Sequence, residues 1–145
     1  MLRYVLLRHD CPPEYRDGPH WDLMLEREGA SDEHRLATWS LTSLPLDWVG
    51  LLGIDPADAA ADCEALQLAD HRAAYLDYEG PIGPGPSGEA RGAVTRLDRG
   101  GLLWVEQSAD RVVVQLGSDG LLTGSLELSA TPGAGGVWRL LWRRG

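Results

Sequence analysis

An imidazole and a carboxylate stand two residues apart in an alternating segment, residues 20–26. Apolar side chains fill the odd-numbered positions of this segment, whereas His20, Asp22, Met24 and Glu26 take the even-numbered ones. Successive side chains of a β-strand point to opposite faces, so His20 and Asp22 would stand on one face, roughly 7 Å apart along the strand. Side chains that converge from such positions can share one metal ion, and the rest of the chain would then have to supply a third ligand.

Histidine is scarce in this chain, which has four, and His9 is the best third ligand. It ends an apolar segment, residues 4–9, that is expected to be a strand. Two histidines and one carboxylate form a common ligand set for a divalent transition metal with open coordination positions. His9, His20 and Asp22 therefore form a candidate metal site, and the open alternative is that each is an ordinary surface or core residue. His34 lies in a polar turn and is expected to be solvated.

The two cysteines, Cys11 and Cys63, belong to no CxxC motif. We expect both to be free thiols in a reducing compartment. Because Cys11 follows His9 so closely, a metal-ligand or redox role remains an alternative for this thiol.

Short apolar segments separated by Gly- and Pro-containing turns favour many strands over a helical bundle. The chain has 145 residues, of which 43% are hydrophobic, and this suits one domain with a real core. We predict a mainly β fold, a compact antiparallel β-barrel with one or two short helices, over residues 1–145. The strands are expected at residues 4–9, 20–27, 35–41, 92–98, 102–108, 111–116, 120–129 and 136–142. The second and third of these are expected to form a hairpin. The tryptophans are expected in the core.

One short helix is expected over residues 57–64. Asp55 can cap its first turn, and Pro56 suits the first helical position. Residues 65–69 would either extend this helix or begin a strand, and the hydrophobic periodicity does not decide between them.

The net charge of −9 disfavours a protein that binds nucleic acid through a broad basic surface, because such binding needs Lys and Arg to neutralise phosphates. It does not exclude a small enzyme that touches only the end of a strand. Residues 1–8 lack the hydrophobic region of a signal peptide, and no apolar run approaches the roughly 20 residues that span a bilayer. We therefore expect a monomeric, soluble, cytoplasmic protein without a membrane partner.

Several segments follow one another in the order found in a known family. They are residues 4–9, residues 20–26, the Thr38-Trp39-Ser40-Leu41 segment, Asp70-His71, and residues 75–80. On these segments the chain resembles the 3′-phosphoesterase domain found at the N-terminus of bacterial DNA ligase D and as stand-alone proteins. The resemblance extends over nearly the whole chain and implies a compact β-barrel with short flanking helices.

The resemblance implies manganese-dependent trimming of DNA 3′ ends, in which a terminal ribonucleoside and then a 3′-phosphate are removed. His9, His20 and Asp22 would bind the metal, with Mn²⁺ expected and Zn²⁺ as the alternative. His71 would act on the reacting phosphate, and Tyr75 would support the catalytic pocket. The implied partners are DNA or RNA/DNA 3′ ends and the proteins of end-joining repair.

Substrate binding is assigned to Arg8, His71 and Glu79. Arg8 is chosen for its closeness in sequence to the site, and Arg16 and Arg72 are alternatives on the same ground. Glu79, just before a glycine, has the alternative role of satisfying backbone donors at a turn.

The chain departs from the family pattern in the longer gap between His9 and His20, in the Thr42-Ser43-Leu44 segment, which replaces a basic one, and at three further positions. Met24 stands where the family has an arginine, Ala69 replaces a glutamate, and Cys63 replaces a basic residue. A guanidinium can grip phosphate with two hydrogen bonds and a thioether cannot. Three functions therefore stay open: a phosphoesterase for 3′ ends, a hydrolase for a smaller substrate, and a non-catalytic module that keeps the metal.

Overall fold

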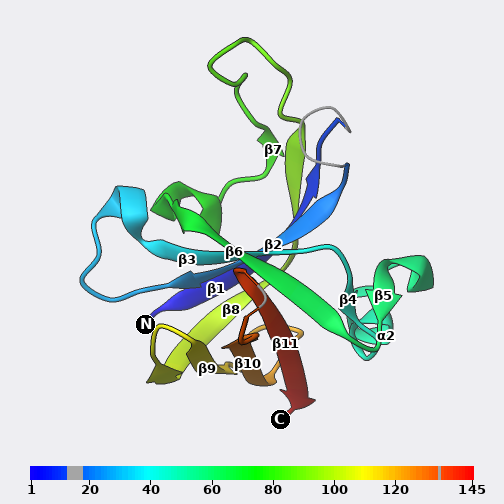
Figure 1. The fold of residues 1–145 in the computed structure, drawn as a ribbon, viewed down its shortest axis with the longest axis vertical. Helices are drawn as coiled ribbons and strands as arrows, with labels where there is room; N and C mark the ends of the chain where they lie inside the picture. Colours follow the sequence, from blue (N-terminus) through cyan, green and yellow to red (C-terminus); the bar gives the residue numbers. More distant parts are fainter. Residues whose placement is uncertain (13–17, 134) are drawn as a thin grey trace.

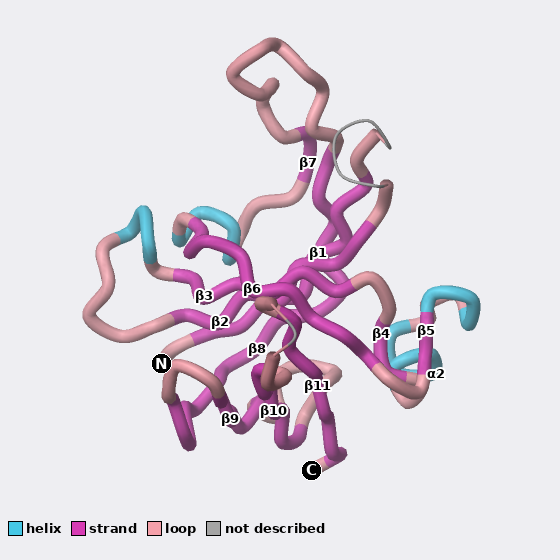
Figure 2. Tube along the Cα trace, viewed as in Figure 1, coloured by secondary structure: helices cyan, strands magenta, loops and turns pink. Residues whose placement is uncertain are grey.

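A computed structural model describes residues 1–12, 18–133 and 135–145, and it is mainly β (Figures 1 and 2). The strands of its main sheet are β1 (Arg3–Asp10), β2 (His20–Glu26), β3 (Leu36–Leu41), β6 (Cys63–His71), β7 (Gly80–Pro81), β8 (Ala93–Gln107), β9 (Arg111–Leu116), β10 (Gly124–Ala130) and β11 (Val137–Arg144). Their order is β1-β2-β3-β6-β11-β10-β9-β8-β7. A further antiparallel pairing of β1 with β8 closes the sheet into a ring, so the predicted mainly β, barrel-like fold is confirmed.

The remaining elements are short and are not strands of this main sheet. Two-residue strands β4 (Leu44–Pro45) and β5 (Ala59–Ala60) pair in parallel. The helix α2 (Trp48–Leu52) lies beside them on one side of the molecule (Figure 1). Single 3₁₀ turns complete the described chain: η1 (Asp32–His34), η2 (Pro56–Asp58) and η3 (Ala73–Leu76). In the part of the chain that the structure describes, no helix has both the length and the apolar character needed to cross a bilayer.

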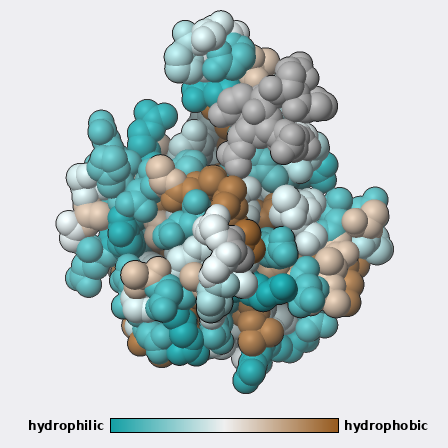
Figure 3. Space-filling model, in the orientation of Figure 1, coloured by the Kyte–Doolittle hydropathy of each residue, from teal (hydrophilic) through white to brown (hydrophobic). Residues whose placement is uncertain are grey.

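The alternation of side chains on β1, β2 and β3 produces two separate apolar clusters. The larger cluster fills the interior of the ring and contains Trp21, Trp39, Trp48, Trp138 and Trp142, with Trp104 packed against it. The predicted core position of the tryptophans is thus confirmed, and Trp39 and Trp138 meet edge to face at 5.5 Å between ring centroids. A smaller cluster lies on the other face of the same strands: Val5, Leu7, Met24, Leu36, Leu76 and Val94. In Figure 3 the visible surface is mostly hydrophilic, with apolar groups in separate small areas.

The hairpin of residues 20–27 and 35–41 is confirmed, but the helix expected over residues 57–64 is wrong. Asp55 does accept a hydrogen bond from the Ala57 amide (2.9 Å), yet it caps only the single turn η2. The chain then enters β5 and β6, where Cys63 and Ala65 are buried between β3 and β11. Pairing with two neighbouring strands outweighs the local helix signals here.

The strands expected at 92–98 and 102–108 form one continuous strand, β8, of 15 residues. The glycines between them do not make a turn. Gly100 lies opposite Tyr4 of β1, where a Cβ would come within 3.0 Å of the tyrosine ring. The glycine therefore permits close approach of two strands, which is the other common reason for glycine within a sheet.

A buried hydrogen-bond network joins the start of the chain to this long strand. The Tyr4 hydroxyl donates to Asp98 at 2.6 Å, and the same carboxylate accepts from the backbone amides of Leu121 and Leu122 at 2.9 and 3.0 Å. Burial and the neighbouring Asp98 carboxylate raise the pKa of Tyr4, which keeps the hydroxyl protonated as a donor.

Tyr4→Phe removes this donor while keeping the ring. We expect it to lower the free energy of unfolding by about 1–2 kcal/mol, because a buried charged acceptor loses a partner. Urea unfolding followed by tryptophan fluorescence measures the change. Tyr78→Phe is the matched control, since Tyr78 is 40% exposed; equal losses in the two variants would contradict the structural role of the Tyr4 hydroxyl.

Candidate metal centre

The register of β1 and β2 places the predicted metal ligands together. His9 lies directly opposite His20, and Leu7 lies directly opposite Asp22. Opposite residues of an antiparallel pair share a face, so His9, His20 and Asp22 all point away from the interior of the ring. The three side chains are buried, at 5%, 4% and 3% exposure.

Each histidine approaches a different oxygen of the same carboxylate. His9 Nδ1 lies 3.7 Å from Asp22 Oδ2, and His20 Nε2 lies 3.4 Å from Asp22 Oδ1. The two imidazole rings meet edge to face with centroids 4.6 Å apart. Ligand atoms about 2.0–2.2 Å from one ion lie about 3.0–3.6 Å from each other, so these separations are close to those of a shared first coordination shell.

The far nitrogen of each ring faces a backbone carbonyl. His9 Nε2 lies 2.6 Å from the carbonyl oxygen of Arg91, and His20 Nδ1 lies 3.5 Å from that of Gly18. A ring N–H that donates to such a carbonyl fixes the tautomer and leaves the lone pair on the other nitrogen. His9 Nδ1 and His20 Nε2 then both offer lone pairs toward Asp22, which is how metal-binding histidines are usually oriented.

This arrangement leaves acceptors facing acceptors inside the protein. Among the described residues, His20 Nε2 and Asp22 Oδ1 are buried and have no hydrogen-bond partner. Burial works to raise the pKa of Asp22, but where His20 and His9 donate hydrogen bonds to the carboxylate these interactions outweigh burial and hold that pKa well below its usual range. With imidazole lone pairs turned toward it instead, the carboxylate has no such donors. A charged carboxylate and imidazole lone pairs with so few donors are suited to a bound cation, so these residues fit a divalent metal ion.

Beside the candidate ligands lies a small cavity of about 90 Å³. Its walls are formed by His9, Asp22, Met24, His71, Tyr75, Ile82, Arg91 and Val94. The cavity therefore joins two predicted ligands with His71 and Tyr75, although 49 residues separate Asp22 from His71 along the chain. Met24 forms part of an apolar wall together with Val94, on the face where the alternation places it.

The strand β6 and the turn η3 carry His71 and Tyr75 to this cavity. Asp70 pairs with Arg27 just beyond the end of β2, which holds the end of β6 against the β2–β3 hairpin. His71 Nδ1 lies 2.8 Å from the carbonyl oxygen of Ala69, so Nε2 is the ring nitrogen left for other partners. The His71 ring meets Tyr75 edge to face at 5.7 Å.

The basic residue of the cavity is Arg91, which sequence reasoning missed. Gly92 explains its position: this residue has φ = +81°, and a Cβ there would overlap the backbone of Asp10 and Cys11. Glycine thus lets the chain press against the end of β1, where the Arg91 carbonyl meets His9. The Arg91 guanidinium is held by a 2.6 Å hydrogen bond from Nε to Gly83. The only signal in the sequence was an arginine before a glycine in a loop.

Two of the predicted substrate-binding residues lie away from the cavity. Arg8 has the opposite parity to His9; its guanidinium pairs with Asp10 at 2.9 Å and lies over the Trp21 ring. Glu79 accepts a hydrogen bond from the Arg96 backbone amide at 3.0 Å, so it satisfies a backbone donor, although this donor lies in strand β8 and not at a turn.

Of the two alternatives to Arg8, Arg72 alone belongs to the described part of the chain. Arg72 is exposed at the start of η3 and is absent from the cavity's described walls. Arg16 lies outside the described residues. Exposed His34 is solvated, as predicted.

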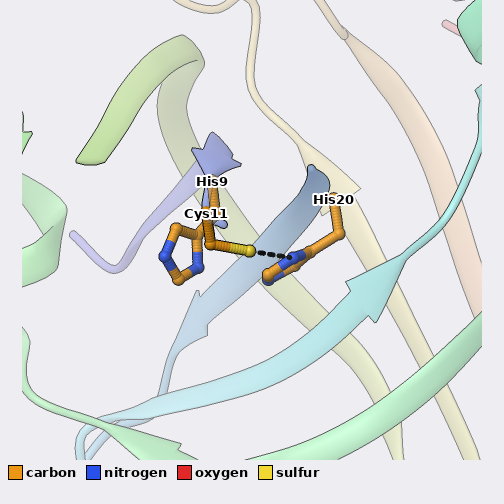
Figure 4. Close-up of side chains that lie close together, drawn as sticks. All are labelled: His9, Cys11 and His20. Carbon is orange, nitrogen blue, oxygen red and sulfur yellow. Dashed lines mark hydrogen bonds between the residues drawn. The ribbon is translucent and has the colours of Figure 1, made fainter. Parts of the chain in front are cut away.

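Cys11 lies on the other side of His20 from Asp22. Its Sγ is 3.8 Å from His20 Nδ1 and 3.0 Å from the Gly18 carbonyl oxygen. Figure 4 shows this sulfur pointing at the His20 ring, with His9 beside it. His9, Cys11 and His20 form a buried group, with one ligand atom from each within 4.8 Å of the others, that could hold a metal ion.

A larger hollow of about 470 Å³ reaches the site at His20. It is lined by Gly18, Pro19, His20, Ser40, Thr42, Glu64, Ala65, Leu66 and Val137. His20 is thus a wall of this hollow as well as a candidate metal ligand. Among the described residues that line the hollow, none is Lys or Arg and one, Glu64, is acidic.

Comparison with models of known families finds none that matches this chain, and comparison with curated proteins finds no match either. The chemistry of the site is therefore the basis for a functional proposal.

Metal binding should stabilise the fold measurably. An ion present at 100 times its Kd adds about 2.7 kcal/mol, or about 5–10 °C in Tm for a chain of this length. We expect Mn²⁺ or Zn²⁺ to raise the Tm of the EDTA-treated protein and Asp22→Asn to remove most of the Mn²⁺ shift. His34→Ala, at the exposed histidine, should keep the full shift; an equal loss there would contradict a site at His9, His20 and Asp22.

Proposed function

We propose that this protein is a divalent-metal-dependent phosphoesterase. The observation that carries the proposal is the convergence of His9 Nδ1, His20 Nε2 and the Asp22 carboxylate in a buried site beside a cavity that also holds an arginine and a third histidine. Such a combination of metal ligands, a cationic side chain and a proton donor suits the hydrolysis of a phosphate ester.

The metal would be held by His9, His20 and Asp22. When bound, a divalent ion polarises a phosphoryl oxygen and stabilises the charge that develops on it. Two imidazoles and a carboxylate accept several first-row metals. We propose Mn²⁺, which the resemblance to the ligase D phosphoesterase domain favours.

The other residues of the cavity would bind and protonate the substrate. Arg91 supplies the positive charge that Met24 cannot, because a guanidinium can donate two hydrogen bonds to a phosphate. Once protonated on both nitrogens, His71 can donate a proton to the leaving oxygen from Nε2, because its Nδ1–H is held by the Ala69 carbonyl. Tyr75 packs against the His71 ring and so orients it.

The substrate we propose is the 3′ end of a DNA or RNA/DNA strand, cleaved at a terminal ribonucleotide or a 3′-phosphate during end-joining repair. The cavity of about 90 Å³ is small and suits one phosphate group at a strand end. We propose that the protein works in the cytoplasm as a monomer, alongside repair proteins.

A second candidate is a phosphoesterase for a small molecule. The specific observations that favour it are the net charge of −9 and the presence of one arginine, Arg91, and no lysine among the described residues of the cavity. A long nucleic-acid strand would normally be met by several cationic side chains.

The enzyme assay uses Mn²⁺ with primers that end in a 3′-phosphate or a 3′-ribonucleotide. We expect release of phosphate or nucleoside by the wild-type protein, background rates for His20→Ala and Asp22→Asn, and full activity for His34→Ala. Bis-p-nitrophenyl phosphate is run in parallel as a small substrate, and cleavage of this compound alone would favour the second candidate. A metal-loaded protein that cleaves none of these would contradict the proposed reaction.

Arg91→Ala should lower kcat/KM by about 10²–10³, the usual cost of losing one donor aimed at a developing negative charge. Arg91→Lys should restore part of the rate, because the charge returns without the paired donors. Arg143→Ala, at an exposed residue of β11, should leave the rate unchanged. Metal affinity measured on the same samples separates a lost phosphate contact from a disturbed His9: unchanged Mn²⁺ binding with a reduced rate is expected.

A further inference from the structure

We propose that Cys11 is a sulfur ligand of the same centre, which gives the two histidines a second coordination mode that favours a thiophilic ion such as Zn²⁺. This inference rests on the proposed function for one point, that His9 and His20 bind metal. It adds a ligand which the resemblance does not imply, and it concerns which ion the site takes.

The two ring nitrogens of His20 face two different candidate ligands. Nε2 lies toward the Asp22 carboxylate at 3.4 Å, whereas Nδ1 lies toward Cys11 Sγ at 3.8 Å. In a tetrahedral zinc site with Zn–S of about 2.3 Å and Zn–N of about 2.0–2.1 Å, sulfur and nitrogen are about 3.5 Å apart. The observed separation therefore needs only a small closing movement, and Figure 4 shows the sulfur already aimed at the ring.

The surroundings of the thiol suit a metal ligand. Cys11 is 7% exposed, and His9 and His20 are less exposed than that. All three ligand atoms lie within 4.8 Å of one another. Cys11 directly precedes Pro12, a residue with restricted backbone freedom, at the end of β1, so the thiol is held close to the strand that carries His9.

Two ligand sets therefore share the same histidines. In the first set, histidine nitrogens are joined by a carboxylate oxygen of Asp22, and this set suits a hard ion such as Mn²⁺. In the second set, histidine nitrogens are joined by the thiolate sulfur of Cys11, and this set suits Zn²⁺. When Cys11 binds, its thiol proton passes to solvent as the sulfur–metal bond forms. Binding through Nδ1 needs the other tautomer of His20, in which the proton lies on Nε2, facing Asp22, and the contact of Nδ1 with Gly18 is given up, so one ion at a time uses this imidazole.

Cobalt substitution tests the proposal without any hydrolysis assay. Reduced, EDTA-treated protein is titrated with Co²⁺ and then with Zn²⁺ in competition. We expect a near-ultraviolet sulfur-to-cobalt charge-transfer band in the wild type, its loss in Cys11→Ser, and a Zn²⁺ affinity at least about tenfold weaker in that variant. Cys63→Ser is the matched control, because Cys63 is the other buried thiol and contacts Ser43 and the Ala60 carbonyl.

The two ligand sets also predict opposite metal preferences for two variants. Cys11→Ser should weaken Zn²⁺ and leave Mn²⁺ binding unchanged, whereas Asp22→Asn should weaken Mn²⁺ and keep the sulfur-to-cobalt band. A third measurement needs no variant: bound Zn²⁺ should protect Cys11 of the wild-type protein from an alkylating reagent, as measured by mass spectrometry.

A wild-type cobalt complex without the sulfur band, or a band that survives Cys11→Ser, would overturn the sulfur ligand. A protein that shows the band but hydrolyses no phosphoester would instead refute the proposed reaction and leave the sulfur ligand standing.

Discussion

The site depends on the register in which β1 pairs with β2. His9 meets His20 only because the two strands are aligned as they are, and a shift of one residue would turn His20 and Asp22 into the ring and expose Trp21 and Leu23. The interior cluster fixes that register, because Trp21 and Leu23 are buried within it only when they face into the ring. The hydrophobic core and the candidate metal centre are thus opposite faces of the same alternation.

That alternation explains how much of the molecule could be predicted from sequence. A half-buried strand shows its period of two within a few residues, and His20 and Asp22 could be assigned to one face from residues 20–26 alone. The ring of β-strands followed from the same signal repeated along the chain. The hairpin of β2 and β3 needed only a short polar turn between two such segments.

Features set by contacts distant in sequence were beyond such reasoning. The helix predicted at 57–64 had sound local signals, but β6 pairs with β3 and β11 and buries Cys63. Arg91 belongs to a loop without periodicity, and only the approach of Gly92 to the backbone of β1 brings it to the site. Closeness to His9 in sequence suggested a role for Cys11 only as an alternative, whereas its contact with His20 is set by the Gly18 carbonyl, which both side chains meet.

Arg91 meets the site through its backbone and carries a cationic side chain beside it. Its carbonyl faces the far nitrogen of His9, while its guanidinium is bonded to the Gly83 carbonyl. An anion that draws the guanidinium into the cavity would also move the carbonyl that orients this imidazole. Binding of the ion and binding of the anion are then thermodynamically linked, and linkage is reciprocal: each changes the affinity for the other by the same factor. One residue would thereby make metal occupancy depend on the presence of substrate.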